Sequence, residues 1–149
     1  MLLNIKKNAN ELAKKYDTRN PFDIINSLNV IILHVPLVGI RGFYQYFQRN
    51  NIIYLNEELS EHEARFVLAH ELGHMFLHKD TNTIFMDTST HFNTDRYEIE
   101  ANAFAMDLLI SDDALMEYHE FSLEQISRAL GYDKELLKLR LQQNSHIGG

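Results

Sequence analysis

The sequence predicts an α+β fold with a small, mostly antiparallel sheet and helices before and after it. Stretches rich in β-branched and aromatic residues lie close together in the chain, at Val30–Val35, Gly39–Phe47 and Asn51–Leu55. Proline, glycine and a polar turn at residues 49–51 separate these stretches. The other segments with a regular apolar pattern repeat at the spacing of helices.

Two helices are expected before the strands. Residues 3–16 repeat apolar side chains at near-helical spacing, and their lysines fall on the opposite, solvated face. Asn20 followed by Pro21 is typical of a helix cap and first turn, which predicts a short helix through Leu28. Both segments are interpreted as scaffold.

Five helices are expected after the strands. Residues 60–63 have the Ser-x-x-Glu spacing of a capping box and begin a helix that runs to about His78. Asp95 caps a second long helix that reaches Ile110. Shorter helices are expected after Ser111, after Ser122 and over residues 133–142. The polar residues 79–93 are predicted to form a loop, and a loop of about this length often covers a site.

Composition limits the class of protein. With 149 residues, 45% of them hydrophobic, the chain has the size of one domain, expected over residues 1–143, with a disordered tail at 144–149. The net charge of -7 argues against nucleic acid as a direct partner. No apolar run is long enough for a signal peptide or a membrane span, which predicts a soluble cytoplasmic protein without a membrane partner.

Residues 70–74 read His-Glu-Leu-Gly-His and match H-E-x-x-H. Positions i and i+4 lie on one face of the expected helix, so His70 and His74 can converge on one Zn²⁺. Glu71 can reach a water on that ion and serve as the base that transfers its proton to the leaving amine. Because the chain has no cysteine, any metal must be held by histidine and carboxylate.

The third ligand must come from another segment, and the helix after Asp95 offers Glu98 and Glu100. Residues two apart on a helix point about 200° away from each other, so only one of them can face the metal. Helix geometry alone leaves the choice open. Alternatively, both glutamates are solvated surface acids.

The segments HELGHMFLH (residues 70–78) and EIEANAFAMDLL (residues 98–109) strongly resemble the ImmA/IrrE zinc metallopeptidases. The resemblance extends over nearly all of residues 1–142. It implies that Glu100, directly before Ala-Asn, is the third ligand of one zinc ion. It also implies a fold like that of the thermolysin-type zincins, with the sheet packed against the active helix.

The resemblance also implies a function. ImmA-type proteins are anti-repressors that cleave a helix-turn-helix immunity repressor and so derepress a prophage or an integrative element. A metalloendopeptidase with such a repressor as its substrate is therefore the expected activity. Two alternatives remain: a module that sequesters the repressor around a structural metal, and a transcription factor that uses the helix-turn-helix-like residues 122–141.

Several further residues have more than one interpretation. Tyr44, Tyr46 and Tyr97 are candidates for stabilising an oxyanion, although tyrosines in strands and packed helices are usually structural. His78 either supports the metal ligands or is a helix-end residue that interacts with the helix dipole. The extended substrate of a zincin usually pairs with an edge strand, for which residues 51–55 and 39–47 are both candidates.

Overall fold

The computed structural model describes residues 2–79, 86–87 and 95–148. Its elements confirm the predicted α+β class. In chain order they are α1 (Leu2–Tyr16), α2 (Pro21–Ile25), β1 (Val30–Val35), β2 (Gly42–Phe47), β3 (Asn50–Asn56), α3 (Glu61–His78), β4 (Met86–Asp87), α4 (Arg96–Leu109), α5 (Asp112–Met116), α6 (Leu123–Leu130) and α7 (Lys134–Gly148).

The sheet has the order β1-β3-β2-β4 and is mixed. β2 pairs antiparallel with β3 and with the two-residue β4, whereas β1 pairs parallel with β3. Two of the three described strand pairs are antiparallel, and the β1–β3 pair is the exception because the chain crosses from β1 to the far side of β3 to form β2. β3 lies between two partners, which excludes residues 51–55 as the edge strand; of the two candidates, β2 remains, since the described β4 pairs only with Gly42 and Phe43.

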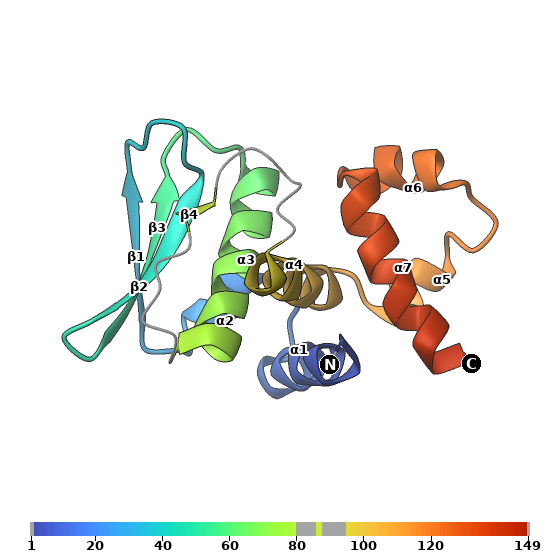
Figure 1. Ribbon diagram of the computed structural model, residues 1–149, viewed down its shortest axis with the longest axis horizontal. Coiled ribbons are helices and arrows are strands. Elements are labelled where there is room, and N and C mark those ends of the chain that lie inside the picture. Colours follow the sequence, from blue (N-terminus) through green and yellow to red (C-terminus); the bar gives the residue numbers. More distant parts are fainter. Residues whose placement is uncertain (1, 80–85, 88–94, 149) are drawn as a thin grey trace.

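One face of the sheet packs against α3 (Figure 1). Tyr44, Ile53 and Leu55 are buried on this face, and the register pairs Tyr44 with Ile53 and Gly42 with Leu55. A Cβ atom on Gly42 would lie 2.8 Å from the Val67 Cγ1 atom of α3 and 2.6 Å from the Tyr54 carbonyl oxygen. The strand and the helix therefore approach each other more closely than a larger residue would allow.

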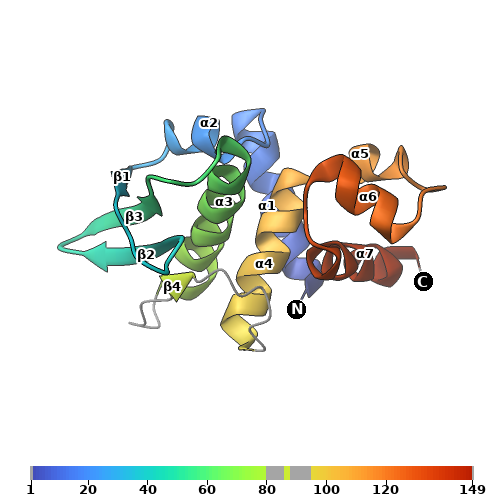
Figure 2. The same ribbon diagram turned by 90° about the horizontal axis from the view of Figure 1, so that it is seen from above.

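The helices form successive layers beyond the sheet. In Figure 2, α3 lies beside the sheet, α4 and α1 come next, and α5, α6 and α7 lie at the opposite end of the molecule. α3 contacts the sheet on one side and α4 on the other, so residues 66–75 are all buried. α4 in turn packs against α1 and α7. The chain thus places two buried helices side by side at its centre.

Most predicted helix boundaries are confirmed by cap geometry. Ser60 and Ser122 both form capping boxes, Asp95 accepts a hydrogen bond from the Tyr97 amide, and Gly131 ends α6 in the left-handed region at φ 76°. Three boundaries differ. α2 ends at Ile25 rather than Leu28, β2 begins at Gly42 rather than Gly39, and α7 continues beyond residue 142 to Gly148. Gly39 has φ 72°, which explains why the strand begins after it.

One prediction falls largely outside the described residues. Of the expected loop at 79–93, only residue 79 and the strand β4 are described, so its role as a cover stays a prediction. Within the described ranges, none of the helices combines the length and the apolar content that crossing a bilayer requires.

Gly73 permits the close contact between α3 and α4. A Cβ atom at this position would lie 3.2 Å from the Ala101 Cα atom, the Ala101 carbonyl oxygen and the Phe104 Cβ atom. We expect Gly73→Val to lower the free energy of unfolding by about 2 kcal/mol, because the branched side chain overpacks this contact. Urea unfolding would measure it, with the smaller Gly73→Ala as the matched comparison. Equal stability of Gly73→Val and the wild type would contradict the interpretation.

Arg140 ties α7 to α4 from a fully buried position. Its Nη2 atom donates to the Ile110 carbonyl oxygen at 3.0 Å and to the Asp112 carboxylate at 2.7 Å, and its Nε atom lies 3.6 Å from the Asp107 Oδ1 atom. We expect Arg140→Met to destabilise the protein by about 3 kcal/mol, because it leaves the buried Asp107 without its cation. Lys138→Met, on the exposed side of the same helix, should change the free energy of unfolding by less than about 0.5 kcal/mol. Urea unfolding of both variants would test this.

Candidate metal centre

His70, Glu71 and His74 lie together on the buried part of α3. At least one donor atom of each lies within 4.8 Å of the others, and the two imidazole rings meet edge to face with their centroids 4.8 Å apart. The capping box at Ser60 fixes the start of the helix, and the one-turn spacing then places both imidazoles on one face. This arrangement is the one that the H-E-x-x-H spacing predicts.

The carboxylate of Glu98 on α4 meets both histidines. Its Oε2 atom lies 3.0 Å from the His70 Nε2 atom, and its Oε1 atom lies 2.9 Å from the His74 Nε2 atom. The Oε1 atom of Glu71 is 4.0 Å from the same His70 nitrogen. Two imidazole nitrogens and one carboxylate therefore converge on one point, with a second carboxylate beside it.

Hydrogen bonds on the far side of each ring indicate which nitrogen faces Glu98. The His70 Nδ1 atom lies 2.8 Å from the Asn102 Oδ1 atom, and in this pairing the ring donates. A neutral His70 that donates from Nδ1 presents a lone pair at Nε2, directly opposite the lone pairs of Glu98. A divalent cation between them would satisfy both, so the residues present fit a metal ion of the kind that nitrogen and oxygen donors bind.

His74 is held by a chain of side chains that ends on Glu100. The His74 and His78 Nδ1 atoms are 2.9 Å apart, and the His78 Nε2 atom lies 2.9 Å from the Glu100 Oε1 atom. If His74 donates from Nδ1, His78 accepts at Nδ1 and donates from Nε2 to the carboxylate, so every hydrogen bond has one donor and one acceptor. This chain leaves the His74 Nε2 lone pair directed at Glu98, as in His70.

The resemblance implies Glu100 as the third metal ligand, whereas the structure places Glu98 and not Glu100 against the Nε2 atoms of His70 and His74. Glu100 contacts His78 and lies 3.8 Å from the Arg96 Nε atom. Glu98 instead faces the Nε2 atoms of the two histidines of the H-E-x-x-H segment. The argument that only one glutamate can serve is consistent with these separate partners. Asn102 lies four residues after Glu98 and thus on the same helix face, which is consistent with both residues meeting His70.

Burial and charge set the ionisation of the cluster. Burial lowers the pKa of His74 to about 4, which keeps its imidazole neutral near pH 7 and able to coordinate. Burial alone would raise the pKa of Glu98, but the adjacent His70 and His74 outweigh it whenever their Nε2 atoms carry protons that the carboxylate can accept, and they then hold this pKa below its usual value. Neutral imidazoles beside an ionised carboxylate are the forms that bind a metal.

The three tyrosines take different positions. Tyr44 is buried and its hydroxyl donates to the Asn51 Oδ1 atom at 2.6 Å. Tyr46 is half exposed, with the Lys79 ammonium 4.3 Å from its ring centroid. Tyr97 lies on α4 with its ring centroid 4.6 Å from that of His78, the residue that is hydrogen-bonded to His74. Of the three, Tyr97 is therefore the best placed to act near the site.

Two packed helices that bring two imidazoles, the Glu98 carboxylate and the neighbouring Glu71 together form a site of the kind found in metal-dependent hydrolases. The sequence profile described as the IrrE N-terminal-like domain matches residues 26–142. The chain therefore belongs to the ImmA/IrrE family of metallopeptidases.

Two relatives cover almost the whole chain. The uncharacterized immunity region protein 2 of Bacillus phage phi105 is 41% identical over 139 residues, which are 91% of this chain and 88% of the phage protein. Metallopeptidase ImmA of Bacillus subtilis (strain 168) is 31% identical over 145 residues, 93% of this chain and 85% of that protein. The chain therefore corresponds to these relatives over most of their length.

Proposed function

We propose that this protein is a zinc-dependent endopeptidase that cleaves a helix-turn-helix immunity repressor at one site and so derepresses a prophage or an integrative element. The observation that carries the proposal is the Glu98 carboxylate, 3.0 Å and 2.9 Å from the Nε2 atoms of His70 and His74, beside the buried Glu71. The family and the immunity-region name of the phage relative support the regulatory role.

In this proposal His70, His74 and Glu98 hold one zinc ion per chain, and Asn102 and His78 orient the two imidazoles. A bound zinc ion lowers the pKa of a water and polarises the scissile carbonyl. Glu71 takes a proton from the attacking water at its carboxylate and delivers it to the leaving amine. The fold that this chemistry implies is zincin-like, which is supported by α3 packing between the sheet and the helix that carries Glu98.

We further propose that residues 1–143 act as one domain. A single hydrophobic cluster supports this, since it includes side chains from α1, from the sheet, from α3 and α4, and from α6 and α7. A cytoplasmic location is part of the proposal, because the repressor of an integrated element acts on DNA there.

The second candidate is a binding protein that sequesters the repressor around a structural metal. The position of Glu71 favours the enzyme instead. A structural site is complete with its ligands and needs no further acid, whereas Glu71 is fully buried next to the ligands, at 4.0 Å from His70.

Glu71→Gln should abolish cleavage while leaving zinc bound, because the amide keeps the shape of the side chain and cannot accept a proton. The purified protein would be incubated with the helix-turn-helix repressor encoded beside its gene, and the products identified by intact mass. We expect one defined cut with the wild type and none with Glu71→Gln or after chelation. Zinc content by atomic emission would establish that the variant is still loaded.

Three outcomes of that experiment separate the candidates. A single cut that needs both zinc and Glu71 supports the peptidase. An intact repressor that forms a stable complex with all three samples supports sequestration. A cut that persists in Glu71→Gln would contradict the role given to this residue.

Substitution of the two glutamates on α4 tests the assignment of the third ligand. We expect Glu98→Gln to weaken zinc binding by more than about 100-fold, because it removes a ligand charge, and Glu100→Gln by roughly tenfold, because it weakens only the support of His78. A chromophoric chelator competing for zinc would measure both affinities, with the exposed Glu61→Gln as control. A larger loss in Glu100→Gln than in Glu98→Gln would restore Glu100 as the ligand.

A further inference from the structure

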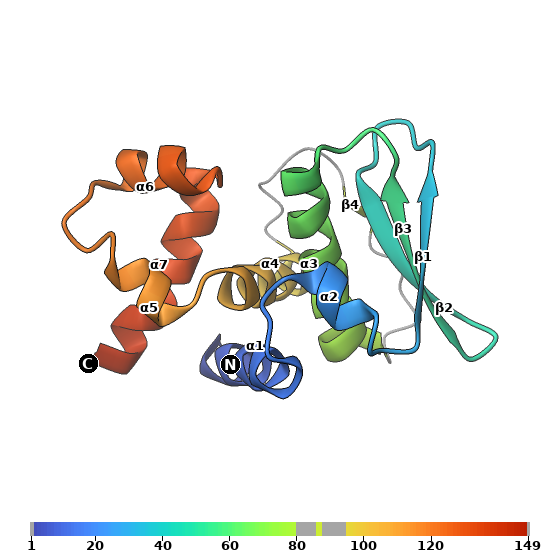
Figure 3. The ribbon, with the colours of Figure 1, turned by 180° about the vertical axis from the view of Figure 1, so that it is seen from behind.

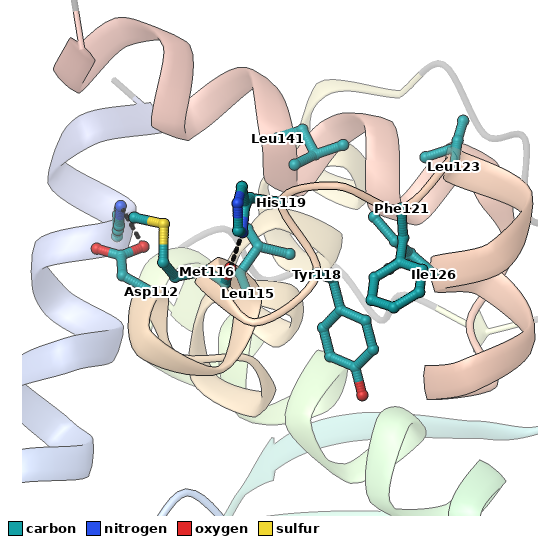
Figure 4. Close-up of a pocket in the computed structure, with 10 residues that line it drawn as sticks. Asp112, Leu115, Met116, Tyr118, His119, Phe121, Leu123, Ile126 and Leu141 are labelled. Atoms are coloured by element: carbon teal, nitrogen blue, oxygen red, sulfur yellow. Dashed lines mark hydrogen bonds and ion pairs between the residues drawn. The ribbon is translucent and has the colours of Figure 1, made fainter.

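α5, α6 and α7 lie on the side of α4 that faces away from α3 and the sheet (Figures 1 and 3), and their side chains, with the loop after α5 and Lys6 of α1, line a largely apolar groove. The groove has a volume of about 510 Å³. Figure 4 shows side chains from the three helices and from the loop after α5 turned towards it; the apolar ones are Leu115, Met116, Phe121, Leu123, Ile126 and Leu141. Met116 is 67% exposed and Phe121 is 50% exposed, so the groove presents large apolar side chains to solvent.

The segment that contributes most of the groove is rich in acidic residues. Residues 112–124 contain five acids, Asp112, Asp113, Glu117, Glu120 and Glu124, and neither lysine nor arginine. Two of these acids are neutralised within the protein, since Asp112 pairs with Lys6 and Arg140, and Glu124 pairs with Lys134. The other three are exposed; His119 lies 3.7 Å from Glu120, and Arg19 interacts with Asp113. Glu117 and Glu120 directly adjoin the exposed Met116 and Phe121 in the chain, so negative charge lies next to the apolar groove.

We propose that this groove docks a positively charged amphipathic helix of the protein substrate. This inference rests on the proposed function. The apolar face of such a helix would cover Met116 and Phe121, and its lysines or arginines would meet Asp113, Glu117 and Glu120. Helices of proteins that bind DNA carry the required positive charge, because they neutralise phosphates.

The same charges argue against a second copy of the chain as the occupant. A symmetric dimer formed through this groove would bring the three exposed acids of each copy close to those of the other, and like charges that are brought together in an interface cost several kcal/mol. A partner of opposite charge has no such penalty. Complementary charge therefore favours a basic helix.

The groove is separate from the candidate metal ligands, so docking there would add to substrate selectivity. The ligands His70, His74 and Glu98 lie at the interface of α3 and α4, whereas the groove is formed beyond α4 by α5, α6 and α7 (Figure 1). A substrate held at the groove would be selected by its helix and not only by the few residues around the cut bond. Such a second contact allows cleavage to be confined to one protein.

The docking experiment uses the full-length protein and two fluorescent peptides. One is a short amphipathic helix of leucine and lysine, and the other has glutamate in place of every lysine. Fluorescence anisotropy at about 0.1 M salt would measure binding. We expect saturable one-to-one binding of the lysine peptide and no binding of the glutamate peptide.

Matched pairs of variants locate the site. Met116→Ser with Phe121→Ser should weaken binding of the lysine peptide roughly tenfold, whereas Ile31→Ser with Leu33→Ser, at exposed positions of β1, should leave it unchanged. Glu117→Lys with Glu120→Lys should also weaken it more than the distant pair Glu57→Lys with Glu58→Lys does. These substitutions are at exposed positions, and unchanged unfolding curves would show that the fold persists.

Several results would overturn the docking proposal. Three of them are absence of binding, equal binding of both peptides, and equal losses of binding in the control variants. A fourth is self-association in sedimentation that the Met116→Ser and Phe121→Ser pair removes, since a second copy of the chain would then be the occupant. Repressor cleavage at the wild-type rate by that pair would also refute docking while leaving the peptidase intact. If instead the lysine peptide docks as expected and the repressor is never cut, the peptidase proposal fails and the docking surface stands.

Discussion

The contact between α3 and α4 is the constraint on which the rest of the structure depends. Gly73 and Ala101 let the two helices approach so closely that a single added carbon would meet the opposite backbone at 3.2 Å. This approach brings Glu98 of one helix within about hydrogen-bonding distance of His70 and His74 of the other. The same spacing places Asn102 on His70 and Glu100 on the far side of His78. A wider gap between the helices would break all of these contacts together.

The buried histidines are held by hydrogen bonds on the side of each ring that faces away from Glu98. Each of the two histidines that face Glu98 has a partner at Nδ1, and the longer chain through His78 ends on a carboxylate. A buried network of this kind is strong when every member is paired and costly when one is lost. The network therefore fixes the orientation of the imidazoles before any metal arrives, which lowers the conformational cost of binding.

The sequence predicted the fold class, the helix caps and the two histidines because these features depend on short-range spacing. A capping box or an i, i+4 pair is defined within one helix, and Ser60, His70 and His74 lie as their spacing requires. The parallel pairing of β1 with β3 depends on how separate segments meet, and the strand patterns alone do not encode it. The choice between Glu98 and Glu100 depends on the rotation of α4 against α3, which the packing at Gly73 determines.

α4 connects the site to the other end of the molecule. Its first half carries Glu98, Glu100 and Asn102, and its second half carries Asp107, which faces the buried Arg140 of α7. Arg19 donates to the Asp107 and Leu108 carbonyl oxygens and so satisfies the open end of the same helix. The backbone hydrogen bonds of a helix resist bending, so a helix that is anchored at both ends keeps its two ends at a constant distance. The distance between the metal-type cluster and the groove among α5, α6 and α7 is therefore set by one rigid element, so a substrate held at the groove would present its chain to Glu71 at a fixed separation.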